Sequence, residues 1–550
     1  MRDPLTAEHL TATGSTAVEM PPRFDRLSDF IPYYGERNPE RPALVAGERV
    51  VNWGELPGRI DDLAAALLRH GVSKGDRVGV WSPPSIEGIL VFMACARLGA
   101  TYVGLNPKYQ LDEVLTVLSD SSPKVVFAAE RTADRDYRAE LAEIPRRGPE
   151  CTRVTVDFDE DGTVGTDAFV GELAGGHHDA VAELATQVQP TDPIALVYTS
   201  GSSGKPKGAL LTQQGFAHNY WRAFGERRMK YLKTPAFFTI NHLAGLGDVA
   251  AMAFVAGGTQ YFMQKFDSEA LVSLIERERI TYLPGLVTHF QMLVRDVEDL
   301  ESRDLSSLEY IWWGGALMPP ELLRRLQAIC PRASTDFGQT ETHGPLIYTP
   351  QDATIEQKVQ TIGRIDDANA VRIYNNDERR VCEPGEPGEV QAHGTQTSPG
   401  YWGNPAASAA LYTEDDWLRT GDLAMVREDG YVVMVGRLSE MFKSGGYNVY
   451  PAEIEAALLE HPAIDMVAVV SVPDPLYQEV GIAFVTLKSR AAITAEELQA
   501  HARSKLANYK IPKRFHICEA LPQTVVGKID KPRLKKFAAE GRDDLAALRG

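Results

Sequence analysis

The chain has 550 residues, too many for one hydrophobic core, so its length favours two or more domains. Hydrophobic residues make up 44% of the chain and charged residues 24%, which excludes a disordered or collagen-like protein. The chain carries 57 basic and 75 acidic side chains, and its formal charge of -18 argues against a nucleic-acid partner.

The N-terminal segment, residues 1–22, is polar and lacks the basic start and apolar centre of a signal peptide. We interpret it as a loose leader without functional content. No apolar run reaches the roughly 18 to 20 residues that cross a bilayer, so we expect no membrane span. The five cysteines are odd in number and too far apart for paired metal ligands, which argues against a disulfide framework and predicts a cytoplasmic protein.

A regular pattern of strands and helices begins near residue 41. A hairpin is followed by alternating helices and strands, which is typical of a mostly parallel sheet covered by helices. The alternation resumes at 124–127 and continues to the strand at 310–313. The first predicted elements are strands 43–45 and 49–51, a helix ending at Gly71, strand 76–81, a helix over about 85–97 and strand 101–105.

The pattern changes twice in the last third of the chain. Beyond Gly363, short segments punctuated by Pro and Gly, such as 381–388, predict a small antiparallel or barrel-like part. From about Arg437 a compact α+β unit is expected. Its predicted elements are helix 451–459, strands 466–472 and 482–487, and helix 494–506.

The unit that follows Arg437 contains a basic stretch at 503–536, in which Glu519 and Asp530 are the acidic residues. On an acidic protein such a stretch favours an anionic ligand, although a solvated basic face is an equally simple interpretation.

The strongest local signal is the segment 198–208, YTSGSSGKPKG, which directly follows the apolar run 194–197. Its glycines let backbone N–H groups converge on an anion, its hydroxyls can donate to phosphate oxygens, and its lysines supply charge. The segment is not a Walker A loop, because Pro206 breaks the required spacing. We therefore predict a polyphosphate cradle rather than a plain surface loop, formed by Thr199, Ser200, Gly201, Ser202, Ser203, Gly204, Lys205 and Lys207.

This loop resembles the signature of the adenylate-forming superfamily, which includes acyl-CoA synthetases, nonribosomal-peptide adenylation domains and beetle luciferases. Further segments resemble the family's motifs in the same order, so that the resemblance spans roughly residues 30–537. They are PAFFTINHLAG at 235–245, GGA at 314–316, DFGQTE at 336–341, TGD at 420–422, GR at 436–437, GGYNVYPAE at 445–453 and the segment 522–528, which ends in VGK.

The resemblance implies an α/β fold with a large N-terminal domain of stacked, mostly parallel sheets with helices and a small barrel-like part. A small, mobile α+β C-terminal domain would act as a lid. The implied boundaries are 23–436 for the adenylating domain and 437–550 for the lid, with a hinge near 437–440.

The resemblance also implies a nucleotide site. Glu341, together with Thr199, would help to hold Mg²⁺, a cation that prefers carboxylate and phosphate oxygens. Phe337 would pack against adenine, and Asp336 would receive the exocyclic amine of the base. A solvated Glu and a core Phe are the simpler alternatives. The remaining implied contacts come from Gly315, Ala316, Gly338 and Thr340.

Two polar residues further along the chain would bind the ribose. A carboxylate accepts two hydrogen bonds, so Asp422 suits a pair of ribose hydroxyls, although a turn or N-cap role would suit it too. Arg437 offers a planar donor fork for ribose or phosphate, with an exposed interdomain salt bridge as its alternative.

The chemical step brings a carboxylate to an anionic phosphate, so positive charge at the transition state is needed. The resemblance gives this role to Lys528. His242 matches a residue that lines or gates the acyl site, against the alternative of an ordinary packing histidine. Leu243 stands where relatives that activate amino acids place an acidic residue, which argues against an amino-acid substrate.

The thiol half-reaction would use the strip that carries Gly445 and Gly446, where a narrow pantetheine arm could approach, and Lys443 lies on the same strip. Ser439, followed by Glu440, departs from the Asp or Lys that is usual at the hinge. Trp312 and Trp313 are bulky beside the first glycine pair and could reshape the acyl pocket.

The resulting hypothesis is an acid–thiol ligase, an AMP-forming acyl-CoA synthetase, that uses ATP and Mg²⁺ to form an acyl-adenylate and then transfers the acyl group to coenzyme A. A partial enzyme limited to one half-reaction, suggested by Ser439, and a non-catalytic nucleotide- or acyl-binding relative are the alternatives. The expected partners are a small-molecule carboxylic acid, ATP and CoA, and a homodimer is compatible with the sequence. The identity of the acid is left open.

Overall fold

The computed structural model describes residues 20–132, 134–156, 169–171, 177–199, 206–366, 370–488, 491–523 and 529–541. The chain folds into two compact units, the first built from 1–371 and 392–419 and the second from 372–391 and 420–550. The predicted mixed α/β class is confirmed. The predicted domain boundary between residues 436 and 437 stays a prediction. The second compact unit also includes residues 372–391 and 420–436, which precede that boundary.

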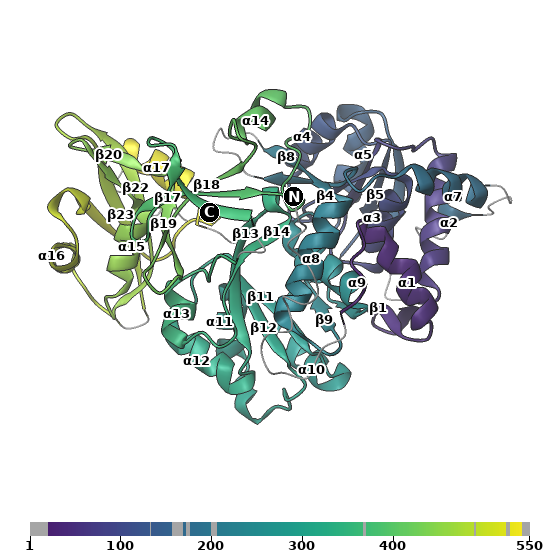
Figure 1. Ribbon diagram of the computed structural model, residues 1–550, viewed down its shortest axis with the longest axis horizontal. Coiled ribbons are helices and arrows are strands. Elements are labelled where there is room, and N and C mark those ends of the chain that lie inside the picture. The colour runs from purple at the N-terminus through teal and green to yellow at the C-terminus, as the bar shows by residue number, and fades with distance from the viewer. Residues whose placement is uncertain are drawn as a thin grey trace. The chain divides into compact units, whose positions relative to one another are not determined.

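The first unit contains three sheets (Figure 1). The largest has the order β6-β5-β3-β4-β7-β8 and is parallel except for β8, which pairs antiparallel with β7. Its strands are β3 (Arg77–Trp81), β4 (Thr101–Leu105), β5 (Val125–Ala129), β6 (Thr152–Val156), β7 (Pro193–Thr199) and β8 (Lys207–Thr212).

The two other sheets of this unit have four strands each, in the orders β2-β1-β10-β9 and β11-β12-β13-β14. Their strands are β1 (Pro42–Ala46), β2 (Arg49–Asn52), β9 (Lys233–Ala236), β10 (Thr259–Phe262), β11 (Tyr282–Leu286), β12 (Tyr310–Gly314), β13 (Ala333–Gln339) and β14 (Gly344–Tyr348). The predicted hairpin at 43–51 and the predicted strands at 76–81, 101–105, 124–127 and 310–313 are confirmed.

Helices cover these sheets. The helices are α1 (Phe30–Arg37), α2 (Leu56–Arg69), α3 (Ile86–Leu98), α4 (Leu111–Ser121), α5 (Arg138–Arg147), α7 (His177–Gln187), α8 (Gln213–Arg227), α9 (Met252–Ala256), α10 (Ser268–Glu278), α11 (Val287–Asp296), α12 (Pro320–Ile329), α13 (Ile355–Gln360) and α14 (Pro405–Ala410). Short turns of helix are η2 (Leu27–Asp29), the π-helix η3 (Ala244–Ala251), η4 (Leu300–Ser302) and η5 (Thr340–Thr342).

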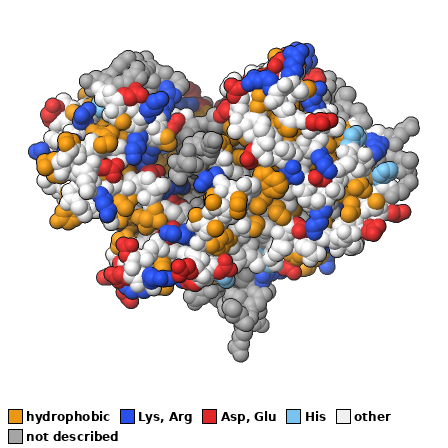
Figure 2. Space-filling view, turned by 90° about the horizontal axis from the view of Figure 1, so that it is seen from above, with side chains coloured by type: hydrophobic (Ala, Val, Ile, Leu, Met, Phe, Trp, Pro, Cys, Tyr) orange, Lys and Arg blue, Asp and Glu red, His pale blue; other side chains and the backbone are white. Residues whose placement is uncertain are grey.

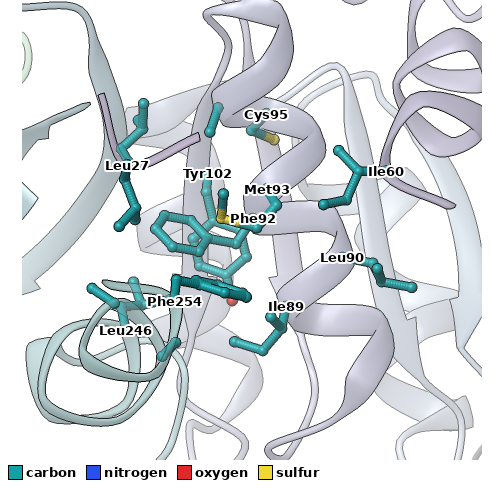
Figure 3. Close-up of a cluster of buried hydrophobic side chains, with 14 of the residues drawn as sticks. Leu27, Ile60, Ile89, Leu90, Phe92, Met93, Cys95, Tyr102, Leu246 and Phe254 are labelled. Carbon is teal, nitrogen blue, oxygen red and sulfur yellow. The ribbon is translucent and has the colours of Figure 1, made fainter. Parts of the chain in front are cut away.

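Both faces of the largest sheet are buried. Successive side chains of a strand point to opposite faces, so neighbouring residues join different core clusters. On β4, Tyr102 joins the core cluster that contains α2 and α3, whereas Val103 and Leu105 join the cluster under α4. Figure 3 shows the first cluster, in which Leu246 and Phe254 of the η3–α9 segment lie near Phe92 and Tyr102. The carboxyl end of one strand of this sheet, β7, leads into the segment YTSGSSGKPKG.

Helix α3 shows how the local sequence sets these elements. Ser85 caps its N-terminus by accepting a hydrogen bond from the backbone N–H of Gly88 at 3.1 Å. Gly99 ends the helix in the left-handed conformation, with φ of 69°. Nearly every residue between them is buried, so the helix lies inside the unit rather than on its surface.

The second unit contains two further sheets, ordered β16-β15-β17-β18-β19 and β21-β20-β23-β22, with β24 paired to β23. The strands are β15 (Ala370–Asn375), β16 (Arg380–Val381), β17 (Pro387–His393), β18 (Leu418–Val426), β19 (Val432–Arg437), β20 (Phe442–Ser444), β21 (Tyr447–Val449), β22 (Ile464–Asp474), β23 (Gln478–Leu487) and β24 (Arg514–Cys518). The helices are α15 (Pro451–Leu459), α16 (Ala495–Lys505), η6 (Asn508–Lys510) and α17 (Lys531–Ala539). The predicted antiparallel part and the α+β unit beyond residue 437 are both present.

The chain has more acidic than basic side chains. The face drawn in Figure 2 carries basic and acidic side chains beside one another rather than one broad basic field. All five cysteines are free thiols. In the part of the chain that the structure describes, no helix has the length and apolar character needed to span a bilayer.

Candidate active site

The predicted phosphate loop connects two paired strands. Strand β7 ends at Thr199 and β8 begins at Lys207, and these two residues are partners in the antiparallel ladder. The hydroxyl of Thr199 lies 3.5 Å from the carbonyl oxygen of Lys207. Ser200, Gly201, Ser202, Ser203, Gly204 and Lys205 lie outside the described residues. The pairing nevertheless brings both ends of the loop to one edge of the sheet.

Lys207, Tyr401 and Glu341 are brought together at this edge. The ammonium group of Lys207 lies 5.4 Å from the centre of the Tyr401 ring, within the range of a cation–π contact. The Tyr401 hydroxyl donates to Oε1 of Glu341 at 2.8 Å. Burial, together with the Glu341 carboxylate, raises the pKa of Tyr401 above its usual value, so the phenol stays protonated and remains the donor.

Tyr401 was not predicted from the sequence. It belongs to the segment 398–402, which backbone hydrogen bonds attach to strand β8: Leu210 N–H donates to Gly400, and Trp402 N–H donates to Gly208. The backbone N–H of Ser398 donates to the carbonyl of Glu341 at 2.8 Å. A segment far away in the chain thus orients the carboxylate, and no local motif around Tyr401 indicates this role.

His343 is a second residue that the sequence did not indicate. It is completely buried, and its Nε2 accepts a hydrogen bond from the backbone N–H of Thr212 at 2.7 Å. Its Nδ1 must therefore carry the proton and donate to the carbonyl of Gln396, 3.0 Å away. Burial lowers the pKa of His343 to about 4, which keeps the ring neutral. This neutral histidine fastens the Glu341 turn to strand β8.

The carboxylate of Asp336 does not have the role expected for it. It forms a buried ion pair with Arg227 at 2.8 Å and accepts the indole N–H of Trp312 at 2.9 Å. The expectation that this carboxylate receives the adenine amine therefore conflicts with its orientation, because it is directed into the interior and is already hydrogen-bonded. Asp336 instead anchors the end of β13 to Arg227 of helix α8.

The other nucleotide candidates of this region lie near the end of β13 or at the end of β12. Phe337 is half-buried and Gly338 is exposed on β13, while Thr340 is buried in η5. A Cβ at Gly338 would lie 1.9 Å from the carbonyl oxygen of Gly344, so only glycine lets the paired strand approach. Gly315 and Ala316 are exposed just beyond β12.

His242 lies between strand β9 and the π-helix η3. It is half-buried, and its Nδ1 accepts the backbone N–H of Ala244 at 3.2 Å. A π-helix is rare and often occurs at functional sites. The neighbouring Leu243 is buried, and Asp248 of η3 is buried with its carboxylate 3.3 Å from the hydroxyl of Tyr220. Burial and the nearby Asp336 raise the pKa of Asp248, so this carboxyl favours its neutral form.

Asp422 and Arg437, both in the second unit, are cross-strand neighbours on β18 and β19. The Nε atom of Arg437 lies 3.0 Å from Oδ1 of Asp422, and the Asp422 side chain is 4% exposed against 57% for Arg437. The ion pair thus lies within one sheet, and the ribose-binding role of the two residues stays a prediction. The preceding Thr420 hydroxyl donates to the carbonyl of Val390 at 2.7 Å and holds the TGD motif to β17.

Gly445 and Gly446 form the two-residue turn of the β20–β21 hairpin, between the paired residues Ser444 and Tyr447. Both glycines have positive φ, 58° and 87°, as this tight hairpin turn requires. Lys443 precedes the turn on β20 and is exposed. The predicted strip is therefore a solvent-facing hairpin tip without side chains at its end.

The basic stretch at 503–536 contains several internal ion pairs. Lys505 pairs with Glu460, Lys510 with Glu453, and Lys531 with two carboxylates. Lys528, the predicted catalytic residue, lies outside the described residues. Part of the stretch thus serves to hold the unit together rather than to present a uniform basic face.

The Mg²⁺ site suggested by the sequence stays a prediction. Among the described residues no group of three or more His, Cys, Asp or Glu side chains could hold a metal ion. The donors that the sequence suggested, the Thr199 hydroxyl and the Glu341 carboxylate, are oxygens of the kind that Mg²⁺ prefers. They would therefore need phosphate oxygens or water to complete its coordination.

Comparison with known proteins identifies the family of this chain. A family model described as "AMP-binding enzyme" matches residues 33–402, and one described as "AMP-binding enzyme C-terminal domain" matches 453–528. An indoleacetate–CoA ligase of Aromatoleum aromaticum is 33% identical, and the match covers 93% of this chain and 98% of the relative. A mitochondrial medium-chain acyl-CoA ligase of Macaca fascicularis is 32% identical, and the match covers 91% of this chain and 85% of the relative.

A solved structure gives the same result. The o-succinylbenzoate CoA synthetase of Bacillus subtilis, in complex with its acyl-adenylate intermediate, is 26% identical and superimposes with a TM-score of 0.76. The match covers 92% of this chain and 97% of that protein. The first family model alone covers more than half of the 550 residues. The chain belongs to the AMP-binding enzyme family.

Proposed function

We propose that this protein is an AMP-forming acid–CoA ligase. In the first half-reaction a substrate carboxylate oxygen attacks the α-phosphorus of ATP, and pyrophosphate leaves with the electrons of the broken P–O bond. In the second, the sulfur of CoA attacks the acyl carbonyl carbon, AMP leaves, and the thiol proton is released. No general base is needed for the first step, because a carboxylic acid is already ionised near neutral pH.

The observation that carries the proposal is the group formed by Lys207, Tyr401 and Glu341 at the edge where the β7–β8 loop begins and ends. It places a fixed cation and an oriented carboxylate beside a Ser- and Gly-rich loop. The lysine can stabilise a polyphosphate and the charge that develops on it during phosphoryl transfer, and the carboxylate would do so through a bound Mg²⁺.

Within this site, Glu341 and Thr199 would hold Mg²⁺ together with ATP oxygens. The ion would neutralise phosphate charge. The hydrogen bond from Tyr401 fixes one carboxylate oxygen of Glu341, which determines the orientation of the other. Phe337 and the exposed backbone of Gly338, Gly315 and Ala316 would border the adenine, in place of the Asp336 carboxylate.

For the remaining parts of the nucleotide and for CoA, Asp422 and Arg437 would bind the ribose. Their ion pair pre-orients the carboxylate and the guanidinium before a ligand arrives. Lys528 would supply positive charge to the transition state. The hairpin tip at Gly445 and Gly446 would leave room for the pantetheine arm, with Lys443 close to it in the ladder.

The acid is expected to lack an ammonium group next to its carboxyl. Leu243 is buried and apolar, so it provides no anion for such a group. The indoleacetate, medium-chain acyl and o-succinylbenzoate ligases to which the chain is similar act on acids without that ammonium group, as their names say. His242 would border the acyl site. A cytoplasmic location and a homodimer stay predictions.

The experiment supplies purified protein with ATP, Mg²⁺, CoA and a panel of fatty, aryl and polycyclic acids, and detects acyl-CoA and AMP by mass spectrometry. Product with at least one acid is expected, and Lys528→Ala is expected to abolish pyrophosphate release while acyl-CoA still forms from supplied acyl-adenylate. Pyrophosphate release without thioester would favour the partial enzyme that Ser439 suggests. Nucleotide binding without any product would favour a non-catalytic relative.

A further inference from the structure

Lys531 lies at the centre of an ion-pair group in the second unit. As the first residue of helix α17, it places its ammonium group 2.5 Å from Oε2 of Glu440 and 3.0 Å from Oε1 of Glu455. Glu455, on helix α15, also accepts the backbone N–H of Val469 at 2.7 Å. The group thus joins α17, α15, strand β22 and the segment that follows β19.

The three side chains are largely removed from solvent, with exposures of 23% for Lys531, 32% for Glu440 and 16% for Glu455. Burial alone would lower the pKa of Lys531, but the two carboxylates raise it above its usual value. The lysine therefore stays charged, and its removal would leave two partly buried carboxylates facing each other without a counter-charge.

Glu440 belongs to the turn predicted to be the hinge. On the side of β19, Arg437 is fixed by Asp422, and the backbone N–H of Leu438 donates to Gly421 at 2.8 Å. On the other side, Glu440 is held by Lys531. Leu438 and Ser439 are the residues between these two anchors. The backbone N–H groups of Glu440 and Met441 also donate to the carbonyl of Arg437, at 3.1 and 3.0 Å, so Glu440 is tied both to the end of β19 and to helix α17.

Lys531 also stands at the base of the segment that contains Lys528. Gln523 and Ile529 form an antiparallel bridge, and the backbone N–H of Asp530 donates to Pro522 at 2.8 Å. Asp530 then caps helix α17 by accepting the backbone N–H of Arg533 at 3.0 Å. The described residues on both sides of 524–528 are therefore tied to one another and, through Lys531, to the hinge turn.

We propose that Lys531 is a positioning residue for adenylation, which acts by fixing the base of the Lys528 segment to the hinge turn at Glu440 and to Glu455. The inference rests on the proposed function, since it assumes that Lys528 supplies charge to the first half-reaction. Lys531 itself does not touch the substrate. Its loss would remove this attachment of the segment's base and leave the charge of Lys528 in place.

The expected result is a selective loss. A displacement of a catalytic group by about 1 Å can cost roughly 100-fold in rate, so Lys531→Met should lower kcat for pyrophosphate release by about 10- to 100-fold. Thioester formation from supplied acyl-adenylate does not need Lys528 and should change less than about threefold. The KM for ATP should change little, because the ATP contacts proposed above lie on other residues.

Three further variants separate positioning from general damage. Lys531→Arg keeps the cation and should recover most of the adenylation rate. Glu440→Gln removes the hinge contact alone and should show the same selective loss of adenylation. It therefore carries the test if Lys531→Met folds poorly. Lys265→Met removes an exposed ion pair with Asp134 in the first unit and should leave both half-reactions unchanged.

Equal losses in both half-reactions of well-folded Lys531→Met and Glu440→Gln, or no loss in either variant, would overturn the proposal. Failure of the arginine variant to recover adenylation would do the same. If the wild-type protein makes no acyl-CoA or acyl-adenylate from any acid, the proposed function itself fails, which is a different result from an active enzyme that is indifferent to Lys531.

Discussion

The guanidinium of Arg227 and the carboxylate of Asp336 form an ion pair at 2.8 Å in which both side chains are almost completely buried. Arg227 also donates to the Tyr282 hydroxyl at 2.8 Å, and Asp336 accepts from Trp312. One buried charge pair therefore connects helix α8 with three neighbouring strands, β11, β12 and β13, and it sets the position of the β13 end that carries Phe337.

Loss of one member of this pair should be costly. Arg227→Met leaves the Asp336 carboxylate buried without its counter-charge, and the free energy of unfolding should fall by about 3 to 5 kcal/mol. The double variant Arg227→Met with Asp336→Asn removes both charges and keeps an acceptor for Trp312, so it should recover more than half of the loss. Urea unfolding of the three proteins measures this. A single variant that loses less than about 1 kcal/mol would contradict the finding that the pair is buried.

The buried His343 predicts a dependence of stability on pH. Its pKa is about 4 in the folded protein, against about 6.5 in an unfolded chain, so below pH 6.5 the unfolded state binds the proton more readily. Stability should fall as the pH drops from 6.5 toward 4, by about 2 kcal/mol between pH 7 and pH 5 from this group.

The check compares wild type with His343→Gln, whose amide oxygen can still accept the Thr212 N–H. The variant should lose less stability than wild type between pH 7 and pH 5 in urea unfolding. His289, for which burial lowers the pKa to about 4 as well, remains in both proteins and contributes equally to the two slopes. Identical slopes would show that His343 is not held neutral.

The Tyr401 hydroxyl should matter for chemistry more than for folding. Tyr401→Phe removes the hydrogen bond to Glu341 and keeps the ring beside Lys207. A hydrogen bond to a charged group contributes about 1.5 to 3 kcal/mol, so adenylation should slow by about tenfold or more. Pyrophosphate release measures the rate. Tyr231→Phe, which loses a hydroxyl contact to Thr259, is the matched control and should keep the wild-type rate.

Asp422 can be tested through the ribose itself. If its carboxylate accepts from the ribose hydroxyls, wild type should prefer ATP over 2′,3′-dideoxy-ATP, and Asp422→Asn should reduce this preference by about tenfold. The ratio of kcat/KM for the two nucleotides isolates the effect from changes in folding. An unchanged ratio in the variant would assign Asp422 to the sheet alone, through its ion pair with Arg437.

Much of the fold could be predicted because it follows from local patterns. The helix at Pro451–Leu459 and the strand at Thr101–Leu105 coincide with their predicted bounds, since apolar periodicity and Gly or Pro punctuation are written in a few consecutive residues. Even the alternation of Tyr102 and Val103 between two core clusters follows from strand geometry. The motif residues were likewise found from their types and order, as for Glu341 and Asp422.

The sequence by itself determined the α/β class, the order of the motifs and the family to which they belong, because each depends on neighbouring residues. Only the tertiary structure decided which side chains meet: Tyr401 with Glu341, His343 with Thr212, Lys531 with Glu440, and Asp336 with Arg227 rather than with an open site. These pairs are 60, 131, 91 and 109 residues apart in the chain. Contacts at such separations depend on how whole sheets and helices pack, and no local pattern of residues encodes that packing.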